Sequence, residues 1–265
     1  MKTLSTSDVT FIIPVRIDSA ARLENLNLVV DYLCTYFGEC IIVLEADIHE
    51  KVHSPKITNK IFEFDPDPVF HRTRYINQMA GSVLSHCIAV WDCDVMVDAL
   101  QIAEGIELIK KGAADMVFPF DGRFYDTPAF MKDVYKESGN NFVVFNLNRG
   151  SFHLMHGYYS VGGAFLVNRR AYLEAGLENE NFYGWGPEDA ERVKRLEILG
   201  YSIARVSGAM YHLFHPRLQN SWFASEKAEL QNRNEFIKVC RMARTDLQYY
   251  VKSWSWYPEG AINVS

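Results

Sequence analysis

The sequence predicts an α/β protein with a mainly parallel central sheet flanked by helices and followed by a helical C-terminal tail. Apolar segments alternate with helix-like segments through the first half, an order that favours parallel βαβ units. These apolar segments are continuous rather than alternating with polar residues, as expected of strands covered on both faces. The expected strands of this half are residues 9–15, 40–44, 87–91 and 115–120.

The helices of the first half are predicted from apolar spacing and from end signals. Between Leu23 and Leu33, apolar residues recur at the spacing of one helix face, and Gly38 follows as a helix end. Asp98 can cap the start of a later helix, and Gly112 closes that helix. The expected helices are residues 22–37, 72–85 and 100–110.

The second half is less regular and ends in a helical tail. No linker rich in Gly, Ser or Pro marks a boundary, so we expect one domain over residues 1–265. We expect strands at residues 162–168 and 201–206, helices at 169–176 and 187–199, a loop at 211–217, and a helical tail from 222 to about 252.

Composition and charge exclude several classes of protein. Of 265 residues, 48% are hydrophobic and 23% charged, which excludes a disordered chain, a collagen and a coiled coil. The formal net charge is −6 and there is no basic block, so nucleic acid is not an expected partner. The five cysteines form no CxxC pair, which argues against a zinc site or a disulfide framework and fits a reducing compartment.

No transmembrane segment is expected. The apolar run at residues 11–15 is too short for a signal sequence and contains Pro14, and no stretch of about 20 apolar residues exists. We therefore expect a cytoplasmic protein and leave open a peripheral association with the inner membrane. The sequence does not indicate an oligomeric state.

Asp92 and Asp94 follow the expected strand at 87–91 with one residue between them. Ligands of open α/β sheets bind beyond the carboxyl ends of the strands, and two such carboxylates can share a hard divalent cation. Acidic residues also follow strands as ordinary turn formers. The pair alone therefore leaves a metal site and a plain turn as alternatives.

His212 and His215 lie three residues apart after a late strand and can face one point. Imidazole suits transition metals better than magnesium, so the pair favours Mn²⁺, with Mg²⁺ as the alternative cation. Most such His pairs are packed or solvated rather than ligating. This pair gains weight because the chain also carries Asp92 and Asp94.

The segment 183–189 places Trp185 between two glycines and just before a pair of acids. Glycines would let this Trp lie against a ligand, which makes the segment a candidate lid. Pro187 followed by acids is also an ordinary helix start. In that case the helix would carry surface ion pairs of Glu188 with Arg192 and of Glu191 with Arg195.

Taken together, these motifs resemble the inverting β-1,4-galactosyltransferase family, which has the GT-A glycosyltransferase fold. The family's IIPFR, FNR and DVD patterns resemble residues 12–16, 70–72 and 92–94, and a helical Asn follows the second pattern, here Asn77. The resemblance spans about residues 10–217. Bacterial capsule and chondroitin-type polymerases carry similar segments and are an alternative kinship that the resemblance implies.

The second half carries the rest of the resemblance. The family's Gly pair resembles Gly162 and Gly163, which also permit a close backbone approach to a ligand. Its WGWGGEDD segment resembles residues 183–189, and its Met and His three apart resemble His212 and His215. Each motif match is a hypothesis about structure and function.

The resemblance implies a role for each of these residues. The metal ligands would be Asp94, His215 and His212, with Asp92 near the ribose or a bound water. Asp189 would be the general base, Glu188 would hydrogen-bond a sugar, and Trp185 would close over both substrates. The residues implied to contact the nucleotide or the donor are Pro14, Arg16, Phe70, Arg72, Gly162 and Gly163, with Glu45 or Asp47 meeting the base or ribose.

The resemblance also divides the chain and bears on the donor. Residues 1–120 would bind the nucleotide, 121–217 would bind the acceptor and hold the catalytic groups, and 218–265 would form the tail. Ser160 stands where related galactosyltransferases have a bulky Tyr, which would leave room for an N-acetyl group on the donor sugar.

We therefore expect a metal-dependent inverting glycosyltransferase. It would move a hexosyl unit, such as Gal, GalNAc or a related sugar, from a UDP-sugar to a hydroxyl of a glycan or glycolipid. Departures from the family at Tyr183, Pro187, Ala190 and His212 leave the donor and the acceptor open. Two alternatives remain, namely a metal-dependent nucleotidyltransferase or phosphohydrolase and a non-catalytic glycan-binding protein on the same fold.

Overall fold

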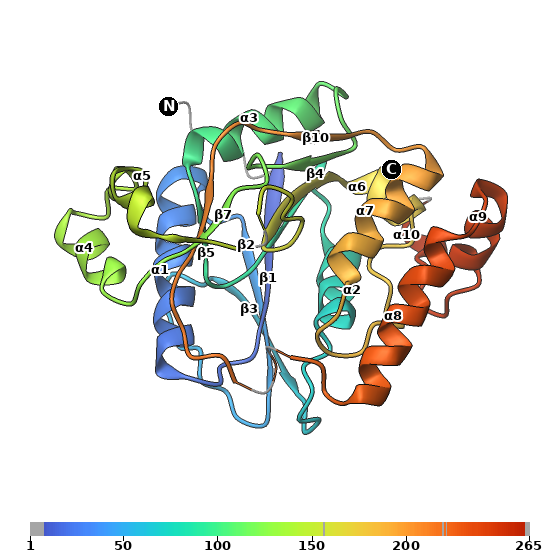
Figure 1. Cartoon of the computed structure of the whole chain (residues 1–265), viewed down its shortest axis with the longest axis horizontal. Coiled ribbons are helices and arrows are strands. Elements are labelled where there is room, and N and C mark those ends of the chain that lie inside the picture. The colour runs from blue at the N-terminus through green and yellow to red at the C-terminus, as the bar shows by residue number, and fades with distance from the viewer. Residues whose placement is uncertain (1–7, 156, 219, 221, 263–265) are drawn as a thin grey trace.

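The structure is a computed structural model that describes residues 8–155, 157–218, 220 and 222–262. A larger mixed sheet forms its centre, and a smaller sheet lies beside it (Figure 1). The larger sheet contains β1 (Val9–Val15), β2 (Ile41–Asp47), β3 (Asn59–Phe64), β4 (Cys87–Trp91), β6 (Met116–Phe118), β9 (Ala164–Asn168) and β10 (Ile203–Arg205). The smaller sheet contains β5 (Val95–Val97), β7 (Phe124–Asp126), β8 (His153–Leu154) and β11 (Met210–His212).

Helices flank the larger sheet on both sides. Figure 1 shows α1 and α2 on opposite sides of β1, β2 and β3, with α7 packed against α8 and α9 at one edge of the molecule. The helices are α1 (Ala20–Phe37), α2 (Arg72–Ser82), α3 (Ala99–Lys110), α4 (Met131–Glu137), α5 (Val143–Asn148), the 3₁₀ helix η1 (Arg149–Ser151), α6 (Arg169–Glu174), α7 (Glu188–Leu199), α8 (Glu226–Cys240), α9 (Arg244–Lys252) and α10 (Glu259–Ile262).

The predicted α/β class is confirmed, and the sheet is mainly parallel with one reversed strand. The strand order of the larger sheet is β10-β6-β9-β4-β1-β2-β3. Strands β1, β2, β3 and β4 pair in parallel, as do β6 and β10, whereas β9 runs antiparallel to both β4 and β6. The reversal of β9 brings the residues that precede it to the edge where β4 ends.

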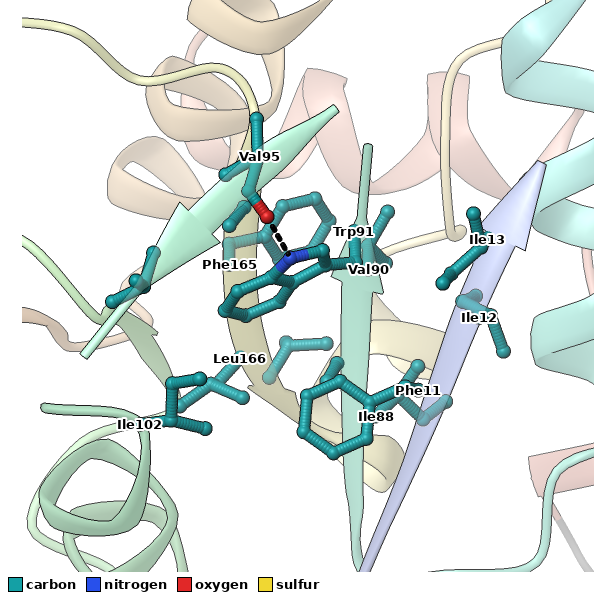
Figure 2. Close-up of a cluster of buried hydrophobic side chains, with 14 of the residues drawn as sticks. Phe11, Ile12, Ile13, Ile88, Val90, Trp91, Val95, Ile102, Phe165 and Leu166 are labelled. Atoms are coloured by element: carbon teal, nitrogen blue, oxygen red, sulfur yellow. Dashed lines mark hydrogen bonds between the residues drawn. The ribbon is translucent and has the colours of Figure 1, made fainter. Parts of the chain in front are cut away.

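The core is centred on β1 and β4, which are buried along almost their whole length. Phe11 of β1 packs against Trp91 of β4 at 5.6 Å between ring centroids and against Phe37 of α1 at 5.4 Å. Figure 2 shows Trp91 lying among these apolar side chains, with its indole N–H donating to the carbonyl of Val95 at 3.0 Å. This bond fixes the turn between β4 and β5, which carries Asp92 and Asp94.

Short elements were missed because they carry no periodic pattern. Strands β5, β7 and β8 and helices α4 and α5 have two to seven residues each. Strand β3 was also missed, because its polar and apolar residues lie on an exposed sheet edge. The loop predicted at 211–217 is wrong at its start, since residues 211–212 belong to β11, which pairs with β5 and β7.

Of the two ion pairs predicted on the surface of α7, one forms, and it is buried. Arg192 and Arg195 are fully buried, and Glu188 and Glu191 are also buried. Glu191 does pair with Arg195 at 2.9 Å, but Arg192 pairs with Glu178 instead of Glu188. Helical spacing predicted which side chains are neighbours along α7, but not that this face packs against the body of the protein.

Among the described residues, no helix combines the length and the apolar character needed to cross a membrane. The tail predicted from residue 222 is helical, as expected, and consists of α8, α9 and α10. The division of the chain into a nucleotide-binding half and an acceptor-binding half stays a prediction.

We predict that Phe11→Ala lowers the free energy of unfolding by about 3–5 kcal/mol, because it leaves a cavity at the centre of the core. Urea unfolding followed by circular dichroism measures this change. The control is Leu100→Ala on α3, where the side chain is 65% exposed, and it should change the value by less than about 0.5 kcal/mol. Equal losses in the two variants would contradict the assigned core.

Candidate active site

A cavity of about 760 Å³ lies beyond the carboxyl ends of β1 and β4. These ends meet at one edge because the two strands are parallel, and antiparallel β9 starts at the same edge. The site residues predicted from the sequence that line this cavity are Pro14, Arg16, Phe70, Arg72, Asp92, Asp94, Gly162, Gly163, Trp185, Glu188, Asp189, His212 and His215.

Glu45 is the predicted site residue that does not line the cavity. Its side chain is fully buried, and its carboxylate accepts backbone hydrogen bonds from Lys51 at 2.7 Å and Val52 at 3.0 Å. Asp47 pairs with Lys51 at 2.7 Å. Both acids therefore hold the loop that follows β2, and this placement does not support contact with a base or ribose.

Asp94, His212 and His215 form a cluster that could hold a metal ion. One ligand atom from each lies within 4.8 Å of the others, and each of the three side chains is at most 11% exposed. Nε2 of His212 is 3.8 Å from Oδ1 of Asp94, and Nε2 of His215 is 3.2 Å from Oδ2. Nδ1 of His212 lies 2.8 Å from Asp126, which leaves Nε2 to face the cluster. Outer carboxylates commonly orient metal-binding imidazoles in this way.

The cluster also contains a fixed positive charge. Arg22 lies 3.2 Å from Oδ2 of Asp94 and pairs with Asp18 at 2.9 Å. Burial opposes ionisation of Asp94, but His212, His215 and Arg22 together hold its pKa below the ordinary value. Burial likewise opposes protonation of His212, yet the charges of Asp94 and Asp126 raise its pKa. The Asp94 carboxylate is therefore ionised, and its buried negative charge is stabilised by the positive groups around it.

Arg16 and Phe70 form another wall of the cavity. The Arg16 guanidinium pairs with Asp65 at 2.5 Å and lies 5.5 Å from the centroid of the Phe70 ring. That ring stacks on Tyr75 with 5.3 Å between centroids, and the backbone N–H of Phe70 donates to Asn220 at 2.9 Å. A flat aromatic ring is thus held beside a fixed cation.

Arg72 links the two acidic parts of the site. Its Nη2 donates to Asp92 at 2.7 Å, and its Nη1 lies 3.7 Å from Oδ1 of Asp189. This Nη1 is buried and has no hydrogen-bond partner among the described residues. An unpaired guanidinium N–H inside a cavity is well suited to donate to an anionic or hydroxyl-bearing ligand.

Glu188 and Asp189 begin α7 and face the cavity, but their surroundings differ. Glu188 is 7% exposed, and its Oε2 has no hydrogen-bond partner among the described residues. Burial, and then the neighbouring charge of Asp189, raise the pKa of Glu188 to about 8 against the opposing pull of Arg72. Asp189 has a side chain that is 27% exposed and pairs with Arg192 at 2.5 Å. The first acid is therefore largely protonated at neutral pH.

Trp185 lies at the rim of the cavity, where its side chain is 42% exposed. Its ring meets Phe223 edge-on at 4.8 Å between centroids. Gly184 on one side has a φ of +72°, a conformation that favours glycine. The Trp is thus presented on a turn, in contact with Phe223 and with part of its surface in solvent.

Comparison with known proteins relates a segment of the sequence, and the fold, to glycosyltransferases. Residues 145–217 match a sequence family described as the N-terminal domain of galactosyltransferase. A mutant of Drosophila β-1,4-galactosyltransferase 7, in complex with manganese, UDP-galactose and xylobiose, superposes with a TM-score of 0.54 at 16% identity, covering 84% of this chain and 78% of that one. This chain has the GT-A fold, and its segment 145–217 is similar to galactosyltransferases.

A second structure shares the same fold. Glucosyl-3-phosphoglycerate synthase from Mycobacterium tuberculosis, in complex with Mn²⁺, UDP-glucose and phosphoglyceric acid, has a TM-score of 0.54 at 12% identity, covering 88% of this chain and 79% of that one. No significant match to a curated protein sequence is found. The expected GT-A fold is confirmed. The match over residues 145–217 agrees with the expected similarity to galactosyltransferases, and kinship to capsule polymerases stays a prediction.

Several residues that line the cavity were not predicted from the sequence. Asp126 could not be found, because it lies on the three-residue strand β7 and meets His212 only through pairing of β7 with β11. Arg22 was predicted only as the first residue of a helix and not as a neighbour of Asp94. The further lining residues missed are Asp18, Phe124, His153, Met155, Tyr159, Arg217, Asn220 and Trp222.

We predict that Glu188→Gln makes stability less dependent on pH. The pKa of this carboxyl rises from about 4.5 in the unfolded chain to about 8 in the folded one. The unfolded chain therefore releases the proton first as pH rises, and the folded protein loses stability between these two values. Relative to the parent protein, the Gln variant should gain more than about 1 kcal/mol between pH 5 and pH 8.

Urea unfolding at a series of pH values measures this gain. The control is Glu197→Gln on the same helix, where the side chain is 52% exposed. It should follow the parent protein across the series. A Glu188→Gln variant that also follows the parent would show that Glu188 is ionised in the folded protein.

Proposed function

We propose that this protein is a metal-dependent inverting hexosyltransferase that moves Gal, GalNAc or a related sugar from a UDP-sugar to a hydroxyl of a glycan or glycolipid. The observation that carries the proposal is that a cation-binding cluster and a separate pair of acids, Glu188 and Asp189, line one cavity. The Drosophila and Mycobacterium structures with the same fold hold manganese together with a UDP-sugar.

The residues present fit a divalent cation. One carboxylate and two imidazoles make a mixed ligand set that favours Mn²⁺ over Mg²⁺. A bound cation would neutralise negative charge on the departing UDP. Arg22 already pairs with Asp94, so it would share this carboxylate with the cation or turn toward the diphosphate.

The nucleotide has a site beside this cluster. Phe70 offers a flat face for the uracil ring, and Arg16 beside it supplies a fixed positive charge. Arg72 has a free N–H for the diphosphate or the sugar. Pro14, Gly162 and Gly163 line the same cavity, and an added Cβ at Gly162 would lie 2.4 Å from Oδ2 of Asp189.

Asp189 is the proposed general base. In an inverting transfer the acceptor oxygen attacks opposite the leaving UDP, so its proton must pass to a group outside the metal cluster. Asp189 lines the cavity, belongs to a different element from Asp94, His212 and His215, and stands at the start of α7, where the helix dipole favours an anion. Glu188, protonated beside it, would donate a hydrogen bond to a sugar oxygen.

Ser160 bears on the choice of donor. Its side chain is 6% exposed, lines the cavity, and has an Oγ without a hydrogen-bond partner among the described residues. A small polar residue there would accommodate an N-acetyl group and could donate to its carbonyl. This supports a donor pocket that accepts an N-acetyl group, so that UDP-GalNAc would serve as a donor beside UDP-Gal.

The direct test is a panel of UDP-sugars with Mn²⁺ and defined glycan acceptors, with release of UDP as the readout. Acceptor-dependent release supports the proposal, and the anomeric configuration of the product, determined by NMR, reports inversion. Competition of UDP-Gal with UDP-GalNAc tests the role of Ser160. Turnover of simple nucleotides with no sugar acceptor would instead favour a nucleotidyltransferase or phosphohydrolase.

We predict that activity requires a divalent cation and is higher with Mn²⁺ than with Mg²⁺. Asp94→Ala and His215→Ala should each weaken metal-dependent UDP binding, measured by calorimetry, because each removes a ligand from the cluster. The control is His153→Ala, which changes an imidazole that lines the cavity outside the cluster. Full activity in excess chelator would overturn the metal assignment.

We predict that Asp189→Asn lowers kcat by about 10²-fold or more, the usual scale of general-base catalysis, and leaves Mn²⁺ and UDP binding nearly unchanged. The control is Asp133→Asn, which changes an exposed acid in the first turn of α4. That variant tests the loss of a helix-start charge and should keep its activity. A folded Asp189→Asn variant with near-normal transfer would show that Asp189 only supports the start of α7.

A further inference from the structure

Asp189 is the outer end of a chain of buried polar groups. The hydroxyl of Tyr172 donates to Glu178 at 2.7 Å, and Glu178 accepts from Arg192 Nε at 2.6 Å and Nη2 at 2.9 Å. The same Nη2 donates to Oδ1 of Asp189 at 2.5 Å. Tyr172, Glu178 and Arg192 are each at most 1% exposed, so Asp189 is the member of the chain that meets the cavity.

The inner end of this chain is fixed in position. Glu178 follows Gly176 and Leu177, which both have positive φ values, of +86° and +61°. Its backbone N–H donates to Asn77 at 2.7 Å, and the Asn77 amide donates back to its carbonyl at 2.9 Å. Burial opposes ionisation of Glu178, but the adjacent Arg192 charge lowers its pKa. Arg192 is thus held by the carboxylate of Glu178, whose own backbone is held by Asn77.

An aromatic ring also packs against the guanidinium of Arg192. Its guanidinium lies 4.0 Å from the centroid of the Phe165 ring on β9. A buried ion pair adds little net stability, because desolvation offsets most of the attraction. The planar, bidentate geometry of an arginine nevertheless fixes direction well. This arrangement is therefore better suited to orienting Asp189 than to stabilising the fold.

The two oxygens of Asp189 have different surroundings. Oδ1 is bound by Arg192. Oδ2 accepts no hydrogen bond from the described residues and points to Gly162, where an added Cβ would lie only 2.4 Å away. One oxygen is therefore anchored, and the other is left beside the glycine pair at the cavity wall.

We propose that Arg192, clamped by Glu178, is the positioning residue of the catalytic base: it anchors one oxygen of Asp189 and leaves the other free to take the acceptor proton. The proposal rests on the proposed function, in which Asp189 is the base. Arg192 itself does not line the cavity. It acts through Asp189.

Arg195 provides a matched comparison. It lies on the same helix, is equally buried, and pairs with Glu191 at 2.9 Å. Its guanidinium donates to the carbonyls of Ala175 and Leu177, and it makes no contact with Asp189. Substitution of Arg195 therefore reports the cost of losing a buried arginine from α7 without loss of the anchor.

The test measures unfolding, Mn²⁺ and UDP binding, and the pH dependence of kcat for Arg192→Gln, Arg192→Lys and Arg195→Gln.

The charged groups around Asp189 are Arg72 from α2, Asp92 after β4, and Glu188 and Arg192 from α7. Loss of the Arg192 charge leaves Arg72 as the remaining nearby cation. The acidic limb of the kcat profile should then move to higher pH.

We expect Arg192→Gln to lower kcat by about tenfold or more, with KM and UDP binding little changed, because a misdirected base loses rate rather than affinity. Arg192→Lys keeps the charge but not the bidentate geometry, so its acidic limb should stay in place while kcat falls. Arg195→Gln should lose stability and keep both kcat and the acidic limb.

A double-mutant cycle separates this proposal from the proposed function. If Arg192 acts through Asp189, adding Arg192→Gln to Asp189→Asn should lower kcat by less than about twofold further. An active Asp189→Asn variant would refute the proposed base. An inactive Asp189→Asn variant together with Arg192 variants of normal kcat and pH profile would overturn the role of Arg192 alone, as would equal effects of Arg192→Gln and Arg195→Gln.

Discussion

The antiparallel pairing of β4 with β9 is the constraint on which the cavity depends. In its register Trp91 lies opposite Ala164, and the N–H of Asp92 donates to the carbonyl of Gly163 at 2.9 Å. This pairing places acids from the first half of the chain beside glycines from the second. Because Gly162 has no Cβ, the carboxylate of Asp189 can approach its backbone. A larger residue at that point would push the carboxylate of Asp189, at the start of α7, away from this wall of the cavity.

Most charged side chains of the site are compensated by other groups of the site. Asp94 lies beside two imidazoles and Arg22. Arg72 pairs with both Asp92 and Asp189. Glu188 has a raised pKa and is protonated rather than paired with a cation. Each charge is therefore adjusted to its neighbours over short distances in a poorly solvated space. A nucleotide diphosphate and a divalent cation would enter such a site together more readily than either would alone, because the pair adds little net charge.

The sequence predicted the elements that carry strong local signals. Strand 9–15 was predicted with its observed limits and helix 22–37 to within two residues at its start, because a buried β-branched run and a helical stripe ended by Gly38 are local patterns. The resemblance to the galactosyltransferase family also predicted most of the cavity residues named in advance. It could not place Glu45, whose partners are backbone amides in a loop, or find Asp126, which reaches His212 only across two short strands. The direction of β9 and the burial of Arg192 likewise depend on contacts distant in sequence.

The candidate lid is tied to the tail. Asn232 on α8 is buried, and its amide donates to the carbonyls of Tyr183 at 3.3 Å and Trp185 at 3.1 Å. It also packs so closely on Gly186 that an added Cβ would lie 2.6 Å from its Nδ2. The turn that carries Trp185 therefore cannot swing as an independent flap, since it must either break both bonds or carry α8 with it. The rate at which product leaves the cavity would then be set in part by a helix that contributes no side chain to the cavity wall.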